Sequence, residues 1–234
     1  MDGFFFIFRS HKRHLKAFSL FFVLFFLLVF VAFGSGCQKA VNYFDYVSEL
    51  RNNILLASDE TFSLRVHSVE REIPYLADGI PKEKTTLTEV RLDADGQKSQ
   101  CTIEFSYNGK TYGGEASYDN VKSEYFYSCS LDTSKAKEIL FKIRFDDTVC
   151  ELNAKSVLDE NALSPKKVLS LVQAEEKQLF SALTDKYGFK GEIYLRLLYE
   201  DAPYYYVGIV SREKKTVAFL LNAKTGKILA RREA

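Results

Sequence analysis

The sequence predicts a mainly β protein with an α+β part. We expect an N-terminal helix and an antiparallel β-sandwich of immunoglobulin-like architecture, followed by a helix packed on a three-stranded antiparallel sheet. Two observations predict this fold class. Residues 58–158 alternate apolar and polar side chains in short runs separated by turns, as half-buried strands do. Residues 164–234 open with a long helical pattern and continue with three alternating runs.

The first 36 residues differ in character from the rest of the 234-residue chain. They hold eleven of its 20 Phe and four of its 32 Lys and Arg side chains, against a single acid, Asp2. The remainder is close to neutral, with 28 basic and 30 acidic side chains. A near-neutral chain that is 47% hydrophobic is not a disordered polyelectrolyte, and it gives no electrostatic reason to expect a nucleic-acid partner.

This first segment has the pattern of an export signal. Basic residues between Arg9 and Lys16 precede an apolar run at 17–33, which only Ser19 interrupts. At 17 residues, the run also reaches the lower end of the roughly 17–25 that a membrane-spanning helix needs, so an uncleaved anchor is an alternative. With either anchor, the positive flank stays inside and the remaining chain lies on the outer side of the membrane.

Small residues follow the apolar run and end at a cysteine, in the order Gly34-Ser35-Gly36-Cys37. This tetrapeptide resembles the lipobox of bacterial lipoproteins. The resemblance implies that residues 1–36 are a signal peptide and that Cys37, acylated on sulfur with a fatty acid such as palmitate, becomes the mature N-terminus. It also implies that the protein is lipid-anchored to the cell membrane, on the extracytoplasmic face.

Residues 37–57 are predicted to form the lipidated start and an amphipathic helix. Asn42 is placed to cap this helix, and Asp45 falls in its first turn. The helix is indicated by apolar residues spaced four, three and four apart, which are Tyr43, Val47, Leu50 and Ile54.

Residues 58–158 are predicted to form the β-sandwich domain, with about six short antiparallel strands. From about Glu60 the period of the pattern switches to two, and further strands are expected at 86–92 and 124–131. The chain has no Trp, so the buried Trp of true immunoglobulin domains is missing. The expected likeness is therefore one of architecture only.

Two hairpins fix the expected strand registers in this domain. Asn108-Gly109 is typical of a two-residue type I′ turn, because both residues tolerate a positive φ, and it places Phe105 opposite Tyr112. A weaker turn about residue 146 places Ile143 opposite Cys150. In both hairpins apolar side chains meet apolar side chains, so pattern and turn agree.

Residues 164–234 are predicted to form a second, helix-plus-sheet domain. Ser164 is a helix N-cap with Pro165 at the first helical position, and the apolar pattern runs to a stop at Gly188. Alternating strands are expected at 193–199, 204–210 and 217–221. One helix on a three-stranded antiparallel sheet is an α+β layer.

The end of this domain carries a second resemblance. Tyr204-Tyr205-Tyr206-Val207 and the closing Asn222-Ala223-Lys224-Thr225-Gly226-Lys227-Ile228-Leu229, which follow a helix and a strand, resemble the PepSY domain over about the last 70 residues. PepSY domains occur in exported bacterial proteins, some as inhibitory prodomains of peptidases. The resemblance implies a binding or folding role with an exported peptidase as a partner, and it supplies no catalytic residues.

Catalytic and metal-binding patterns are scarce after residue 36. A Ser-His-Asp or Cys-His site needs a His beside the nucleophile, and only His67 is present there, on a polar strand face. No C-x-x-C or H-x-x-x-H spacing occurs, so we expect no metal and no cofactor. A glycosidase needs only two acids across a cleft, which keeps a carboxylate-dependent envelope hydrolase as an alternative.

Tyrosines supply the candidate binding surface. Tyr75 and Asp78 lie in a segment bounded by two Pro, where a rigid loop would present the Tyr ring. Tyr205 points to the face opposite its two Tyr neighbours and offers apolar contact together with a hydroxyl. The structural alternative for the Tyr75 segment is a plain connection between strands. The structural alternative for Tyr205 is packing against the long helix.

Three cysteines remain once Cys37 carries lipid. Export permits disulfide formation, and Cys129 is the expected partner of Cys101, because neither hairpin register opposes two cysteines. The alternative is that Cys101, Cys129 and Cys150 are small core hydrophobes.

These observations together predict a membrane-anchored extracytoplasmic lipoprotein that binds or scaffolds other molecules of the cell envelope without catalysing a reaction. Its partners would be the membrane, through lipid on Cys37, and an envelope protein. A PepSY-type regulator or inhibitor of an exported peptidase is the first alternative, and a carboxylate-dependent hydrolase is the second.

Overall fold

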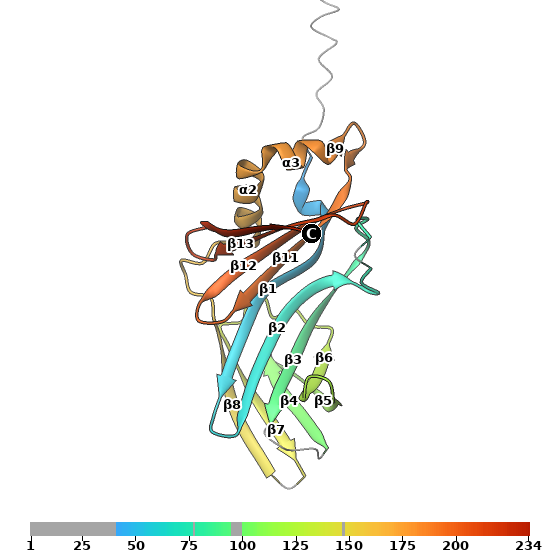
Figure 1. The fold of residues 1–234 in the computed structure, drawn as a ribbon. Coiled ribbons are helices and arrows are strands. Elements are labelled where there is room, and N and C mark those ends of the chain that lie inside the picture. The colour runs from blue at the N-terminus through green and yellow to red at the C-terminus, as the bar shows by residue number, and fades with distance from the viewer. Residues whose placement is uncertain (1–40, 77, 95–99, 147) are drawn as a thin grey trace, which may run out of the picture. The chain divides into compact units, whose positions relative to one another are not determined.

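The computed structural model describes residues 41–76, 78–94, 100–146 and 148–234 (Figure 1). Val41–Ala234 cluster as one compact unit. The predicted signal peptide, its apolar run and Cys37 lie outside the described residues. Within the described ranges, no helix has both the length and the apolar character needed to cross a membrane.

Eight antiparallel strands close into a barrel. Around the barrel they follow the order β1-β2-β3-β6-β5-β4-β7-β8, and a short pairing of Leu55 and Leu56 with β8 returns the sheet to β1. Their bounds are β1 (Val47–Ser58), β2 (Phe62–Glu72), β3 (Lys84–Ala94), β4 (Cys101–Tyr107), β5 (Lys110–Asp119), β6 (Glu124–Cys129), β7 (Glu138–Phe145) and β8 (Thr148–Ser156).

Four more strands extend the same sheet beyond β1 and carry helices on one face (Figure 1). The sheet strands are β11 (Gly191–Tyr199), β12 (Pro203–Ser211), β13 (Thr216–Asn222) and β14 (Ile228–Glu233). The covering elements are the short 3-10 helix η1 (Tyr43–Tyr46), α2 (Pro165–Glu175), α3 (Lys177–Ala182) and the hairpin of β9 (Thr184–Asp185) and β10 (Gly188–Phe189).

The first strand belongs to both parts of the sheet. Residues 47–51 of β1 pair in parallel with β11, and Leu55 and Leu56 near its other end pair with β8. Val47 and Leu50 accordingly lie in the core under the helices, and Leu55 lies in the core of the barrel. β1 therefore connects the two cores within a single sheet.

The predicted β-sandwich with an N-terminal helix is wrong. The strands of the sandwich prediction form one sheet that closes on itself, and residues 47–58 are a strand. The register shifts between Val47 and Glu49, and this irregularity moves the alternation by one residue. Val47 and Leu50 thus reach the same core at a spacing of three, which imitates a helical turn.

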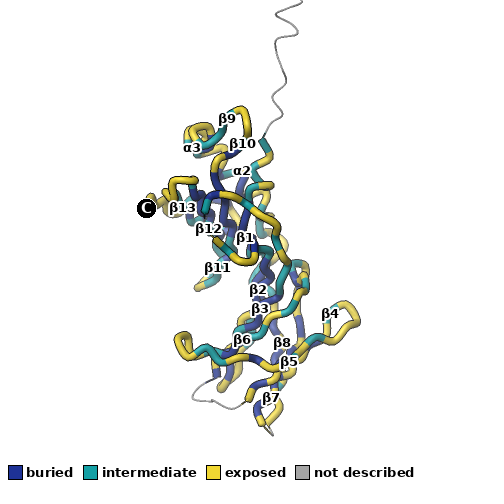
Figure 2. The backbone as a smooth tube through the Cα atoms, turned by 90° about the vertical axis from the view of Figure 1, so that its right-hand side faces the viewer, coloured by how far each residue is buried: buried dark blue, intermediate teal, exposed yellow. Residues whose placement is uncertain are grey.

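The barrel interior is filled with side chains. Phe62 stacks on Phe145 with ring centroids 5.3 Å apart, and Phe105 packs against Phe141 at 4.7 Å. The remaining wall is aliphatic and includes Leu64, Val66, Val90, Leu92, Ile103 and Ile143. Burying each such side chain stabilises the fold by about 1.5–3 kcal/mol, so this interior is a packed core. Figure 2 shows the buried stretches along the strands and the exposed ones at the turns.

Both predicted hairpin registers are confirmed. β4 and β5 pair Phe105 with Tyr112, and the turn residues Asn108 and Gly109 have φ values of 51° and 74°. β7 and β8 pair Ile143 with Cys150, as expected from the alternation. The turn chemistry and the apolar pattern are local signals, and they suffice for local pairing.

The predicted helix from Pro165 to Gly188 ends early. Ser164 caps α2 as expected, with its Oγ 3.3 Å from the Lys167 nitrogen, but the backbone leaves helical geometry at Glu176. A second short helix, α3, then ends at Ala182. The three predicted strands are present as β11, β12 and β13, and β14 follows them as the outer edge strand.

Candidate functional site

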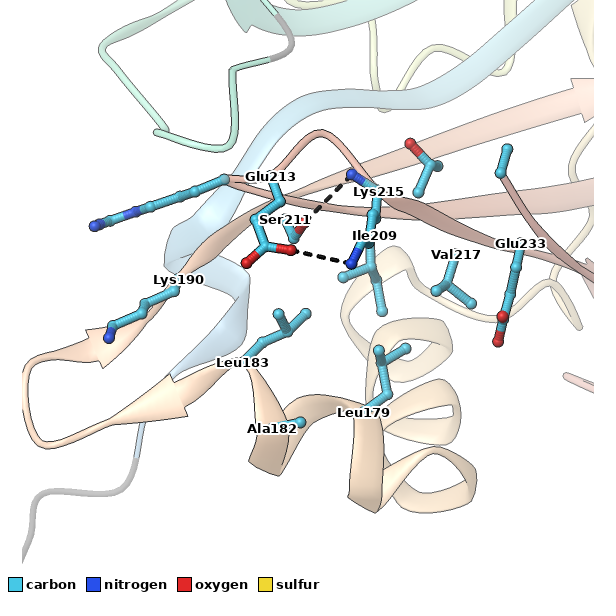
Figure 3. A pocket seen from close by; sticks show the side chains of 13 residues that line it. Leu179, Ala182, Leu183, Lys190, Ile209, Ser211, Glu213, Lys215, Val217 and Glu233 are labelled. Carbon is cyan, nitrogen blue, oxygen red and sulfur yellow. Dashed lines mark hydrogen bonds and ion pairs between the residues drawn. The ribbon is translucent and has the colours of Figure 1, made fainter.

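A pocket of about 790 Å³ opens between α3 and the ends of β12 and β13 (Figure 3). Leu179, Ala182 and Leu183 line it from the helix side, and Ile209 and Val217 line it from the sheet. With six residues, α3 is too short to cover this end of the sheet face. The volume falls within the range of about 300–1,000 Å³ typical of ligand pockets.

Charged side chains surround the mouth of this pocket. Lys215 pairs with Glu213 at 3.1 Å (Figure 3), and Lys190 pairs with Asp185 at 2.7 Å. Arg212 forms no ion pair within the part of the chain that the structure describes, although it lines the same mouth. The hydrogen bond from Lys190 is the main cause that lowers the pKa of nearby Asp185, and the positive charge of Arg212 adds only a small contribution. An apolar wall beside this guanidinium suits a ligand with an apolar group and a negative group.

The opposite face of β11 carries a buried polar cluster. Tyr194 donates its hydroxyl to Glu192 at 2.5 Å, and the Tyr75 ring meets the Tyr194 ring edge-on at 5.5 Å. Glu72 completes the set, and its carboxylate accepts the Lys82 backbone N–H. We call Glu72, Tyr75, Glu192 and Tyr194 the acid–tyrosine cluster.

Both acids of this cluster are deeply buried and incompletely satisfied. Glu192 is 0% exposed and Glu72 is 1% exposed, and the Oε2 atom of each has no hydrogen-bond partner among the described residues. Burial raises the pKa of Glu192, with smaller contributions in the same direction from Glu72 and Asp78. Burial also raises the pKa of Tyr75 to about 12, and it raises the pKa of Tyr194 further. Burial therefore favours the neutral forms of Glu192, Tyr75 and Tyr194.

The loop between β2 and β3 joins this cluster to the pocket side of the molecule. Asp78 accepts the Ile80 N–H at 3.0 Å and pairs with Lys82 at 2.8 Å. Gly79 has φ +77°, and a Cβ at this position would lie 2.9 Å from the Arg212 backbone. Glycine thus lets the loop pack directly on the start of the β12–β13 turn, beside the pocket mouth.

Compared with protein-family models, curated proteins and solved structures, this chain matches none. The described residues also contain no group of three or more His, Cys, Asp or Glu side chains that could hold a metal ion.

The structure brings two of the predicted site residues together. Tyr75 and Asp78 lie in one loop, with the Tyr75 ring turned inward onto Tyr194 and half-buried. Tyr205 lies on the other face of the sheet, 0% exposed, and donates its hydroxyl to the Leu163 carbonyl at 3.0 Å. Tyr205 is thus a core residue under the helices and offers no surface for binding.

The three described cysteines are free thiols, so the structure contains no bridge between Cys101 and Cys129. Cys101 is fully buried in the barrel core, where β4 pairs with β5 and β7. Burial raises the pKa of its thiol to about 12, with a smaller contribution from Cys150. This corresponds to the alternative in which these cysteines pack as small hydrophobes.

The sequence predicts His67 on a polar strand face, but its side chain is buried. Burial lowers its pKa to about 3, and the positive charges of Arg51, Arg65 and Arg91 add to this effect. The imidazole is consequently neutral at physiological pH.

The sequence interpretation missed Glu72, Glu192 and Tyr194. A signal for two of them was present, because Glu192, Tyr194 and Arg196 alternate with the apolar residues of β11 and so share one face of the strand. The alternation does not show that the loop between β2 and β3 covers this face and buries the acids.

Proposed function

We propose that this chain is an extracytoplasmic lipoprotein, held to the membrane by lipid on Cys37, that binds an envelope protein through the pocket beside α3 without catalysing a reaction. The pocket carries the binding part of the proposal, because it combines an apolar wall with a charged mouth. The lipobox-like Gly34-Ser35-Gly36-Cys37 supports the anchor.

The chemistry of the pocket selects one kind of occupant. Leu183 and Val217 offer aliphatic contact, and Arg212 stands beside them without an ion-pair partner among the described residues. A peptide segment that inserts one aliphatic or aromatic side chain and presents a carboxylate to Arg212 would satisfy both features. The partner is therefore an exported protein with an exposed acidic-apolar segment.

A pocket-filling substitution tests this proposal. Ala182→Phe places an aromatic ring in the pocket from an exposed position on α3, so it should exclude the partner's side chain without disturbing the core. The measurement is mild crosslinking on intact cells, followed by capture of the full chain and quantitative mass spectrometry. We expect at least about a tenfold loss of the specific partner, the equivalent of about 1.4 kcal/mol.

Ala174→Phe is the matched control. Ala174 is also an exposed helical alanine, on α2, and it does not line the pocket. This variant should capture the partner as the unsubstituted chain does. Equal capture by Ala182→Phe would place the interaction elsewhere, and a chain that captures no partner above background would contradict the proposal.

A peptidase-directed regulator is the second candidate. It is favoured by the fact that every residue lining the pocket belongs to the segment 164–234, which carries the PepSY resemblance. If the captured partner is a peptidase, adding the full chain should lower its turnover, and Ala182→Phe should restore that turnover. If the captured protein has no peptidase activity, the regulator is ruled out and the non-catalytic binding role stands.

A further inference from the structure

The β9–β10 hairpin is fixed to the segment where the described chain begins. Tyr43 of η1 hydrogen-bonds Thr184 of β9, with 3.1 Å between their hydroxyl oxygens, and its ring meets Phe189 of β10 edge-on at 5.3 Å. Tyr46 accepts the Phe189 N–H at 3.2 Å. The start of the unit at Val41 and this hairpin therefore belong to one packed end of the molecule.

The tip of the same hairpin carries an exposed aromatic ring. Tyr187 is 82% exposed, and every other described aromatic side chain is buried or half-buried. The Lys186 ammonium lies 4.8 Å from the centre of the Tyr187 ring. An exposed Tyr beside a Lys is the combination that favours membrane–water interfaces, because the ring and the aliphatic stem are apolar and their ends are polar.

Chain length brings this end close to a membrane if Cys37 carries lipid. Four residue steps separate Cys37 from Val41, and fully extended chain spans at most about 14 Å over that distance. A lipid anchor at Cys37 would thus hold Val41, and with it the β9–β10 hairpin, within reach of the headgroup layer. This step rests on the lipid anchor of the proposed function.

We propose that the tip of the β9–β10 hairpin, formed by Lys186 and Tyr187, contacts the lipid headgroups of the membrane that holds the anchor. The Tyr187 ring lies at the boundary between headgroups and acyl chains, and the Lys186 ammonium meets lipid phosphates. The turn between β7 and β8 lies at the other end of the unit in both views, so it points away from the bilayer (Figures 1 and 2).

The absence of Trp from the sequence makes this contact directly measurable. Tyr187→Trp introduces the chain's single Trp at the hairpin tip, and its emission is distinguished from that of the 14 Tyr by selective excitation. The substitution keeps the amphipathic character of the ring. The full chain with its native anchor is reconstituted into vesicles of phosphatidylcholine and phosphatidylglycerol, with ordinary or brominated acyl chains. We expect brominated lipid to quench the Trp emission roughly twofold, because the ring reaches the acyl boundary.

Val121→Trp is the control, because Val121 is 94% exposed in the turn between β5 and β6 of the barrel. Its emission should be the same in both kinds of vesicle. Flotation of the vesicles separates the outcomes. A chain that does not float lacks the anchor, which overturns the proposed function and this inference with it. A chain that floats with unquenched Tyr187→Trp, or with both variants quenched alike, overturns the hairpin contact alone.

Discussion

At the scale of single residues, Glu192 shows what it costs to place an acid against a sheet. Its carboxyl group is fully buried, and Tyr194 satisfies Oε1 while Oε2 has no partner among the described residues. Glu72 and Asp78 add negative charge nearby. Deprotonated Glu192 is therefore less stable in the fold than in the unfolded chain.

Glu192→Gln should stabilise the protein at neutral pH. Because the folded-state pKa of Glu192 is raised, the charged form destabilises the fold once the pH exceeds the unfolded pKa, and Gln removes that charge while keeping an oxygen for Tyr194. We expect a gain of about 1 kcal/mol in urea unfolding at pH 8, and no gain well below pH 4, where both side chains are neutral. Glu200→Gln, at an exposed acid after β11, should change little at either pH. A gain that persists unchanged in acid would show that charge is not the cause.

At the scale of elements, Asn53 ties β1 to the barrel rim. Its Nδ2 donates to the carbonyl oxygens of Thr133 at 3.1 Å and Ala136 at 2.9 Å. Its Oδ1 accepts the Ser156 hydroxyl at 2.7 Å, at the end of β8. One buried amide thus joins β1, β8 and the connection between β6 and β7 close to the point where the barrel closes.

Asn53→Ala should destabilise the protein by about 2–3 kcal/mol, because it leaves buried carbonyl and hydroxyl groups without this partner. Asn153→Ala provides the comparison. Asn153 makes one exposed hydrogen bond to Glu138 at 3.2 Å, and its loss should cost less than about 0.5 kcal/mol. Urea unfolding of both variants measures the difference, and equal costs would mean that the Asn53 bonds do not hold the closure.

Local pairing could be predicted from the sequence, and closure of the barrel could not. Asn108-Gly109 carries its turn chemistry in two residues, so the β4–β5 register follows directly. The β1–β8 contact joins Leu55 to Ser156 over a hundred residues of chain, and no local pattern encodes it. Tyr205 shows the same limit for the site, because alternation gives two faces of β12 and does not say which one the helices cover.

At the scale of the whole molecule, the shared strand β1 should make unfolding a single event. Breaking the barrel removes the partner of β11, and unfolding the helix-covered sheet removes one neighbour of β1. We therefore expect amide protection in β4 and in β12 to disappear at the same urea concentration, measured by hydrogen exchange and mass spectrometry. Two separate midpoints would instead indicate independent domains with the boundaries expected from the sequence, near residues 158 and 164.

β14, the outer edge strand, determines how copies of this protein meet one another. β14 carries Arg231, Arg232 and Glu233. The Arg231 guanidinium pairs with the Glu176 carboxylate at 2.9 Å. Arg231 also pairs with Glu233 at 2.7 Å. A second β14 laid alongside would cover these charged side chains and strip them of water, which costs free energy. Lipid-anchored proteins are concentrated in two dimensions, where edge-to-edge stacking is most favoured by mass action. If Cys37 carries lipid as proposed, the charges on β14 would keep neighbouring molecules separate at the membrane surface.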